Sequence, residues 1–429
     1  MDSITQATLG AAMGEATLGR KMKNKALIWG AVAGTIPDLD VFSRFFIENP
    51  QVYGLIYHRG LTHSIFFTLV ASPLFAFVAH EYYRRAWHNK RGFKIAWALI
   101  GSICYALLLF GLAYLIFPSG NTIGLSIWGL LLVGGYFLVK NYIKNLTNGK
   151  DFIYEAKYGQ WVNMFFWGFL THWIIDAFTS YGTQIFEPFS QERISFNNMS
   201  IVDPFFTLPL LLLSVLLVSF SKRTGRRLLW NGLGIIISTA YVGLSFINKA
   251  HANFQFYTNL EEQKIEYNHF VTFPTIGNIV LWQGIAEGLD AYYYGMYSRL
   301  DTNKYIPFTR LSKNHYLLTP YEEDEKIQIL KWFAQDYYTV ATIDDSTIRF
   351  NNLRFGLTAG DLIKPENLKN PYPFGFYIGK RNNEVEVWQS SSIREMDGLD
   401  RKLLLRMFWE RIKGNENPAA TLDLDIEKK

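Results

Sequence analysis

Three short stretches of this chain carry histidine and aspartate in otherwise apolar surroundings. The stretch Pro37-Asp38-Leu39-Asp40 places two carboxylates one residue apart. The stretch His58-Arg59-Gly60-Leu61-Thr62-His63-Ser64 carries two imidazoles on either side of a glycine that allows a turn. In the third, His172-Trp173-Ile174-Ile175-Asp176, the histidine and the aspartate lie one helical turn apart, so their side chains meet on one face. Imidazole and carboxylate groups bind zinc, manganese and iron. The candidate metal ligands are therefore Asp38, Asp40, His58, His63, His172 and Asp176.

Each stretch also has a purely structural interpretation. Proline and aspartate commonly mark a helix end, so Asp38 and Asp40 could be no more than a polar terminus. The two histidines of the second stretch could cap a membrane helix at the interface, with Thr62 as the helix cap. The pair His172 and Asp176 could form a hydrogen bond that serves packing alone. Ionisable groups inside an apolar helix are costly, however, and are usually functional.

Other kinds of site are excluded by the sequence. It has no GxSxG nucleophile elbow, no Walker A loop and no GxGxxG fingerprint. Its one cysteine, Cys104, excludes an intramolecular disulfide, a CxxC redox pair and a cysteine-based zinc site. Lysine and arginine cluster between apolar segments without a continuous basic face, so we expect no nucleic-acid partner.

The composition divides the chain into two parts. Over all 429 residues, 49% are hydrophobic, 17% aromatic and only 18% charged, which excludes a disordered chain. Residues 1–249 carry 21 Lys and Arg against 12 Asp and Glu, whereas residues 250–429 carry 21 against 25. We therefore expect a membrane-embedded helical domain over residues 1–248 and a soluble domain over residues 249–429.

The first part contains six apolar runs, most of them close to the ~20 residues that a membrane-spanning helix needs. Two shorter segments, at about residues 3–19 and 25–36, precede them and carry GxxxG as Gly10/Gly14 and Gly30/Gly34, a spacing that lets two helices pack closely. The predicted fold is an all-α polytopic bundle of about eight membrane segments, the first two of which could be re-entrant. The six runs are residues 61–83, 95–117, 123–139, 160–178, 204–220 and 228–247.

Charge asymmetry orients these segments. Four alternate loops hold 17 of the 21 basic residues of the first part, and the opposite side has only Arg44, Arg59, Arg193 and Lys249. Because basic loops stay in the cytoplasm, both chain ends are predicted to lie outside it. All six candidate ligands, together with Asp2 at the start of the first segment, then reach the outer membrane face at similar depth. Three histidines and three aspartates are enough for one or two metal ions.

The second part is predicted to be a small α+β domain outside the cytoplasm. It has no long apolar run. Alternating stretches indicate strands at residues 278–282, 291–297, 347–355, 374–378 and 384–388. Helical spacing of apolar residues indicates helices at residues 322–338 and 393–412.

The same residues, in this order, resemble the YdjM-like family of inner-membrane metal-dependent hydrolases. The matching stretches are Met1-Asp2-Ser3-Ile4-Thr5, the aspartate pair, the HRGLTHS stretch and residues 172–182, and the resemblance covers roughly residues 1–220. A more distant similarity is to zinc-dependent phospholipase C and single-strand nucleases. The resemblance implies a phosphoester hydrolase in which the six candidate residues are metal ligands.

The chain departs from the family pattern at two positions. Many members have histidine where this chain has Gln6, and some have histidine in place of Val41, directly after the aspartate pair. Glutamine is a poor ligand for softer metals but a good hydrogen-bond partner. We therefore expect Gln6, like Asp2 and Thr62, to lie beside the metal ligands, and the metal to be one or two ions of zinc or manganese.

The predicted function is a membrane-bound hydrolase in which metal-activated water attacks a phosphoester at the outer face. Asp38 or Asp176 would take the proton, and Arg59 would clamp a phosphate, although a lipid headgroup contact explains Arg59 equally well. A site at interface depth suits membrane lipids or another amphiphilic phosphoester. The alternatives are a metal or proton transporter and a non-catalytic scaffold whose metal holds helices together.

Overall fold

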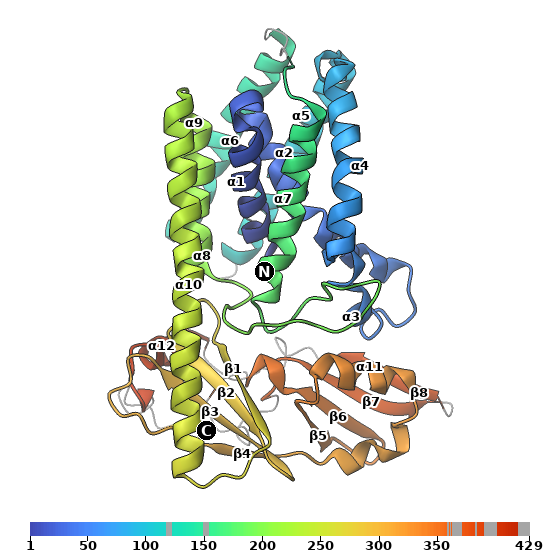
Figure 1. Ribbon diagram of the computed structural model, residues 1–429, viewed down its shortest axis with the longest axis vertical. Coiled ribbons are helices and arrows are strands. Elements are labelled where there is room, and N and C mark those ends of the chain that lie inside the picture. The colour runs from blue at the N-terminus through green and yellow to red at the C-terminus, as the bar shows by residue number, and fades with distance from the viewer. Residues whose placement is uncertain are drawn as a thin grey trace. The chain divides into compact units, whose positions relative to one another are not determined.

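The computed structural model describes residues 1–116, 122–148, 154–357, 360, 362, 371–381, 384–389 and 401–418 (Figure 1). The chain forms two compact units, one of Met1–Ser72 with Asn163–Lys429 and one of Pro73–Val162. All candidate ligands belong to the first unit. The helices up to residue 262 are α1 (Ser3–Met22), α2 (Asn24–Thr35), η1 (Pro37–Phe45), α3 (Gly54–Tyr57), η2 (Leu61–His63), α4 (Ile65–Arg84), η3 (Trp87–Asn89), α5 (Arg91–Ile116), α6 (Thr122–Asn148), α7 (Tyr158–Ala177), α8 (Pro204–Pro209), η5 (Leu210–Leu217), α9 (Val218–Phe220) and α10 (Thr224–Glu262).

Helices α1 and α2 pack directly against each other through their glycines. A Cβ atom on Gly10 would lie 2.3 Å from the carbonyl oxygen of Gly30, and one on Gly14 would lie 2.2 Å from that of Ala26. Only a residue without a side chain allows this approach. The close packing predicted from the two GxxxG motifs is therefore confirmed.

The predicted number of membrane segments is wrong. Among the described residues, two helices are long and apolar enough to cross a membrane, α4 and α10, rather than about eight. Helix α2 has 12 residues, which rise only about 18 Å against a hydrocarbon core of about 30 Å. The apolar stretches Gly124–Phe137 and Pro204–Phe220 are also shorter than a span. The prediction counted each apolar run as a membrane segment. Some of the corresponding helices are short, interrupted or packed inside the protein.

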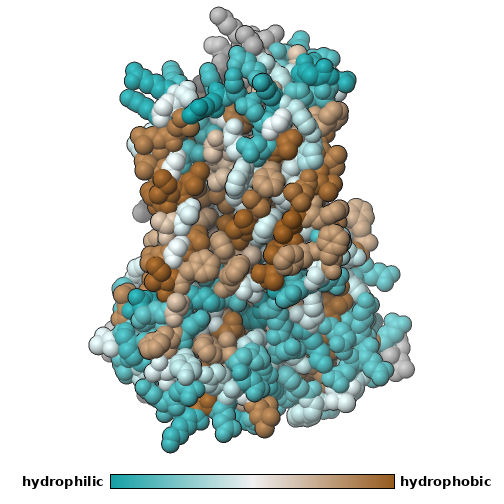
Figure 2. All heavy atoms as spheres, viewed as in Figure 1, coloured by the Kyte–Doolittle hydropathy of each residue, from teal (hydrophilic) through white to brown (hydrophobic). Residues whose placement is uncertain are grey.

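Helix α10 has 39 residues, about twice the length that a bilayer requires. Figure 2 shows apolar side chains gathered on the helices and polar side chains over the sheets. The C-terminal part of α10 packs inside the protein, where Ala252 and Phe256 are buried in one hydrophobic cluster with Trp282. The predicted domain division between residues 248 and 249 falls within this one helix. The exposed apolar residues of α10 include Leu228, Leu229, Ile236, Ile237, Leu244, Phe246, Ile247 and Phe254.

The remainder of the first unit contains two four-stranded antiparallel sheets, each with its strands in chain order (Figure 1). Its α+β character was predicted correctly. Sheet one contains β1 (His269–Pro274), β2 (Leu281–Glu287), β3 (Ala291–Ser298) and β4 (Thr309–Ser312). Sheet two contains β5 (Tyr338–Thr342), β6 (Thr347–Asn352), β7 (Gly375–Arg381) and β8 (Glu384–Gln389). The other elements are η6 (His315–Tyr321), α11 (Glu325–Ala334), η7 (Leu353–Phe355) and α12 (Arg401–Ile412).

The five predicted strands correspond to β2, β3, β6, β7 and β8, and the structure adds β1, β4 and β5. Helix α11 is shorter than predicted, because Asp324 caps its start and Gln335 ends it in a left-handed conformation. Of the second predicted helix, residues 401–412 form α12, and residues 393–400 lie outside the described residues.

Candidate metal centre

Four of the six candidate ligands converge on one point. Single ligand atoms of Asp38, His63, His172 and Asp176 all lie within 4.8 Å of one another. Their side chains are buried except for Asp38, of which 19% is exposed. The arrangement brings together residues from three parts of the chain that lie far apart in sequence.

Local structure explains how each ligand reaches this point. Pro37 begins η1, so Asp38 lies in the first turn directly after α2. His63 ends η2, immediately before the membrane-length helix α4. On α7, His172 and Asp176 are four residues apart and their side chains lie on one face.

Hydrogen bonds orient both imidazole rings with the same nitrogen toward the centre. His172 Nδ1 lies 2.7 Å from the carbonyl oxygen of Gly34, which can only accept, so this nitrogen carries the proton. His63 Nδ1 lies 3.3 Å from Asp40 Oδ2 and 3.0 Å from Thr62 Oγ1. The Nε2 atoms therefore present their lone pairs, and they face each other at 2.9 Å. Two facing lone pairs repel unless a proton or a cation lies between them.

Four of the six distances between the ligand atoms match the edge of a tetrahedral zinc site. A regular tetrahedron around zinc, with bonds of ~2.0–2.1 Å, has edges of about 3.3 Å. Here His63 Nε2 lies 3.4 Å from Asp38 Oδ1 and 3.4 Å from Asp176 Oδ2. His172 Nε2 lies 3.5 Å from each of the same two oxygens. Asp176 Oδ2 is buried and has no hydrogen-bond partner among the described residues, which is expensive unless a cation neutralises it.

The family comparison agrees with this arrangement. The model of the YdjM inner membrane protein family matches residues 1–252, more than half of the chain and every residue of the cluster. The chain belongs to the YdjM inner membrane protein family. No curated protein and no solved structure matches it, so the more distant similarity to phospholipase C has no counterpart among these matches.

In this YdjM-family protein, Asp40 and His58 lie beside the cluster rather than within it. Asp40 Oδ1 accepts from His58 Nδ1 at 2.9 Å, and its Oδ2 accepts from the backbone N–H of Arg59 at 2.8 Å. Through its contact with His63 Nδ1, Asp40 completes a carboxylate–histidine pair of the type that orients metal ligands. Thr62 Oγ1, 3.3 Å from Asp40 Oδ2, lies between these two residues.

Three donors surround the other oxygen of Asp176. The amino group of Met1 and Gln6 Nε2 donate to Asp176 Oδ1, the latter at 3.0 Å. Arg59 is also buried, with its Nη2 atom 3.3 Å from the same oxygen. Gln6 thus lies beside Asp176, one of the four residues that converge. Its Oε1 atom is buried without a hydrogen-bond partner in the described part of the chain.

Arg59 is held in an unusual conformation. Its φ of 59° places a non-glycine residue in the left-handed region, which is uncommon and concentrates at functional sites. Its Nη1 atom donates to Thr179 Oγ1 at 2.8 Å, and its guanidinium lies 4.8 Å from the ring centroid of Tyr181. Its Nε is buried with no hydrogen-bond partner within the described residues.

The charge balance of the cluster favours ionised carboxylates. Burial would raise the pKa of Asp38, but hydrogen bonds from His172 and His63 outweigh it and hold that pKa far below its usual range. Burial would likewise raise the pKa of Asp40, and its bonds to His58 and His63 lower it instead. For His63, burial lowers the pKa, but the hydrogen bonds to both aspartates raise it overall. Without a metal, this site therefore attracts a proton.

Asp2 caps the start of helix α1 and is not one of the four residues that converge. Its side chain accepts from the backbone N–H groups of Ile4 and Thr5 at the start of α1. Two contributors could not be predicted from the sequence: the carbonyl of Gly34, which accepts from His172, and the guanidinium of Arg193, which donates to the His58 carbonyl. No sequence signal identifies a backbone carbonyl, and an arginine in a polar loop looks like an ordinary surface residue.

Proposed function

We propose that this protein is a membrane-bound metal-dependent hydrolase that cleaves a phosphoester. The observation that carries the proposal is the convergence of Asp38, His63, His172 and Asp176 to within 4.8 Å of one another, with two imidazole lone pairs that face each other. When bound, a divalent ion such as zinc or manganese supplies Lewis acidity, which polarises a phosphoryl oxygen and activates water. A second ion would draw on Asp40 and His58, which bond to each other here.

The proposed roles of the side chains follow from their exposure. Asp38 is the cluster member with access to the surroundings, so it is the proposed acceptor of the proton from water. Asp176 is the alternative acceptor. Its three donors at Oδ1 stabilise the carboxylate, however, and so weaken it as a base. Arg59 would stabilise charge on the phosphate through its Nε atom, which has no hydrogen-bond partner among the described residues.

The proposed substrate is amphiphilic, such as a membrane lipid that carries a phosphoester. Support comes from the surroundings of Asp38, because η1 exposes Leu39, Phe42 and Phe45, with Phe46 next to its end. Helix α4, which is long enough to cross a membrane, begins two residues after His63. Exposed aromatic side chains at the end of such a helix are typical of the membrane–water interface.

We also propose that the two sheets lie outside the cytoplasm. Helix α4 ends at Arg84, and Arg85 follows, whereas α10 begins beside Arg223 and Arg226. Basic residues at these ends favour the cytoplasmic side. The opposite ends of the same two helices lead to His63 and to β1, so the metal centre would share the outer side with the sheets.

A second candidate function is a structural metal site. Four protein ligands close the coordination shell of a tetrahedral ion, as in structural zinc sites, whereas catalytic sites keep a position for water. An ion that accepts five or six ligands would leave positions open even with all four residues bound. Hydrolysis, rather than metal content, therefore separates the two functions.

The test uses the purified full-length protein, stripped of metal by a chelator and reloaded with zinc or manganese. We expect metal-dependent hydrolysis of bis(p-nitrophenyl) phosphate that His172→Ala abolishes. His80→Ala is the matched control, because His80 hydrogen-bonds Tyr154 in the other compact unit. Bound metal without hydrolysis by either loaded form would overturn the enzymatic proposal in favour of the structural site.

A further inference from the structure

Sheet two packs against the segment that connects Asp40 to His58, two residues that lie beside the metal centre. We propose that sheet two and α11 act as a positioning device, and that their hold on residues 49–58 sets the affinity of the centre for its metal. The inference rests on the metal centre of the proposed function and assigns a role to the C-terminal part of the chain. Three independent sets of contacts support it.

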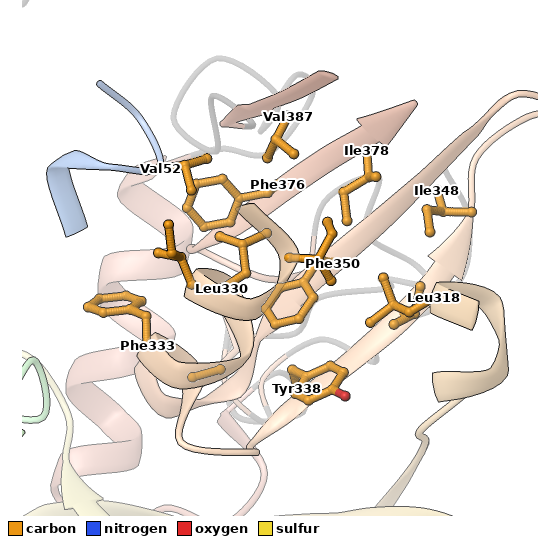
Figure 3. Close-up of a cluster of buried hydrophobic side chains, with 14 of the residues drawn as sticks. Val52, Leu318, Leu330, Phe333, Tyr338, Ile348, Phe350, Phe376, Ile378 and Val387 are labelled. Carbon is orange, nitrogen blue, oxygen red and sulfur yellow. The ribbon is translucent and has the colours of Figure 1, made fainter. Parts of the chain in front are cut away.

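The first set is apolar. Val52 is fully buried and Leu55 is 6% exposed, and both belong to the hydrophobic core of sheet two. Figure 3 shows Val52 directed at Leu330 of α11 and Phe376 of β7. A segment that only connected Asp40 to His58 would not need to contribute side chains to the core of sheet two.

The second set is a row of polar contacts along the same segment. Asn49 Nδ2 donates to the carbonyl of Val387 at 3.1 Å, and the N–H of Gln389 donates to Gln51 Oε1 at 2.6 Å. Both partners lie on β8. Tyr53 donates its hydroxyl to Glu325 Oε2 at 2.9 Å, at the start of α11. The segment is therefore fixed in position, and not merely covered, by sheet two.

The third set passes through Arg193, which is 4% exposed. Its guanidinium donates to the carbonyls of Leu55 at 3.0 Å and His58 at 3.4 Å. The same group lies 5.2 Å from the ring centroid of Phe333 on α11. Gln335, which follows α11, donates in turn to the Arg193 carbonyl at 2.9 Å. Arg193 thus connects the backbone of His58 to α11 directly.

These contacts form a continuous physical connection to a metal ligand. Arg193, which packs against Phe333 of α11, donates to the His58 carbonyl. The His58 side chain bonds Asp40, and Asp40 bonds His63. Coupling between two sites is reciprocal, so a bound metal must stabilise the contacts that improve its binding. Anchoring by sheet two should therefore tighten metal binding, and metal should protect the anchored segment and its partners from opening.

The test compares zinc binding by the full-length protein with that of the triple variant Asn49→Ala, Gln51→Ala, Tyr53→Phe. These substitutions lie on the polar contacts, away from the ligands, and leave the buried Val52 and Leu55 in place. Ser346→Ala is the control, because it removes a hydrogen bond to Asp344 in the β5–β6 turn of the same sheet. We expect the zinc Kd, measured by competition with a chromophoric chelator, to rise roughly tenfold in the triple variant only.

Hydrogen exchange gives a second readout on the unmodified protein. Zinc should slow amide exchange at residues 49–58, in α11 and in β8, and should leave β4 unaffected. If the triple variant unfolds at lower temperature yet binds zinc with unchanged affinity, the contacts serve stability alone and the inference is wrong. Exchange in α11 and β8 that does not respond to zinc would overturn it too. Neither readout depends on hydrolysis, so an inactive protein with coupled metal binding would count against the proposed function only.

Discussion

His63 Nε2 and His172 Nε2 face each other at 2.9 Å while both Nδ1 atoms are engaged elsewhere. The ring of His172 is fixed by the Gly34 carbonyl and that of His63 by Asp40 and Thr62. Neither ring can turn its other nitrogen inward without breaking these bonds. The pair therefore holds a proton or a cation, and the two oxygens of Asp38 and Asp176 at 3.4–3.5 Å favour a cation with more than one charge.

Removal of one ligand should lower the bound metal. We expect His63→Ala and Asp176→Ala each to reduce the metal content of the purified protein, because each leaves an open coordination position. The content is measured by elemental analysis after dialysis against zinc. His80→Ala should retain the content of the unmodified protein, and equal content in all three variants would contradict the ligand assignment.

Metal affinity should rise with pH. The pKa of His63 is raised above its usual value because hydrogen bonds to Asp38 and Asp40 outweigh the effect of burial. A protonated imidazole cannot bind metal, so below this raised pKa each unit of pH should change the zinc Kd about tenfold. Above that pKa the dependence should flatten. Titration calorimetry in two buffers of different ionisation enthalpy would detect the released proton, and an affinity unchanged between pH 6 and pH 8 would contradict the prediction.

Much of the centre could be predicted from sequence because ionisable residues in apolar surroundings have few structural explanations. The four residues that converge were all among the six candidates. The five predicted strands overlap β2, β3, β6, β7 and β8, although the first overlaps β2 only at residues 281–282. The number of membrane helices could not be predicted from the apolar runs alone. Residues 160–178 and 204–220 are apolar, but whether an apolar helix faces lipid or protein depends on contacts that periodicity does not record. Val52 and Arg193 were missed for the same reason, since their partners lie far away in sequence.

Any side chain at Gly10 should disrupt the packing of α1 against α2. A Cβ there would lie 2.3 Å from the Gly30 carbonyl oxygen and 2.8 Å from Gly34 Cα, and overpacking of this kind typically costs about 1–3 kcal/mol. We expect Gly10→Ala to lower the thermal unfolding temperature in detergent. It should also weaken zinc binding, because displaced α2 carries the Gly34 carbonyl that orients His172.

Gly232→Ala in α10 is the matched control for this substitution. A Cβ at Gly232 meets nothing within 4 Å, so alanine should be neutral or stabilise the helix by up to about 1 kcal/mol. Equal unfolding temperatures for the two variants would show that α1 and α2 can separate without cost.

The chain's C-terminal end should lie outside the cytoplasm. The basic residues at the ends of α4 and α10 support this orientation, and both helices are long enough to span. A reporter enzyme that requires export should be active when fused after Lys429. A second fusion after Arg85 should be inactive with the same reporter, and the reverse pattern would invert the proposed topology.

Gln6 should act on the metal through Asp176. Its Nε2 atom donates to Asp176 Oδ1 at 3.0 Å and to the His172 carbonyl at 3.2 Å, so it touches both ligands of α7. We expect Gln6→Ala to weaken zinc binding by about 10–100-fold, the range typical of residues that orient metal ligands. Gln6→His should instead tighten zinc binding, because an imidazole at this buried position adds a nitrogen ligand next to Asp176. Both are measured by chelator competition, with Gln263→Ala as a control, because the Gln263 amide donates to the Ile306 carbonyl away from the centre. If Gln6→Ala and Gln6→His bind zinc equally well, the first helix only shields the centre.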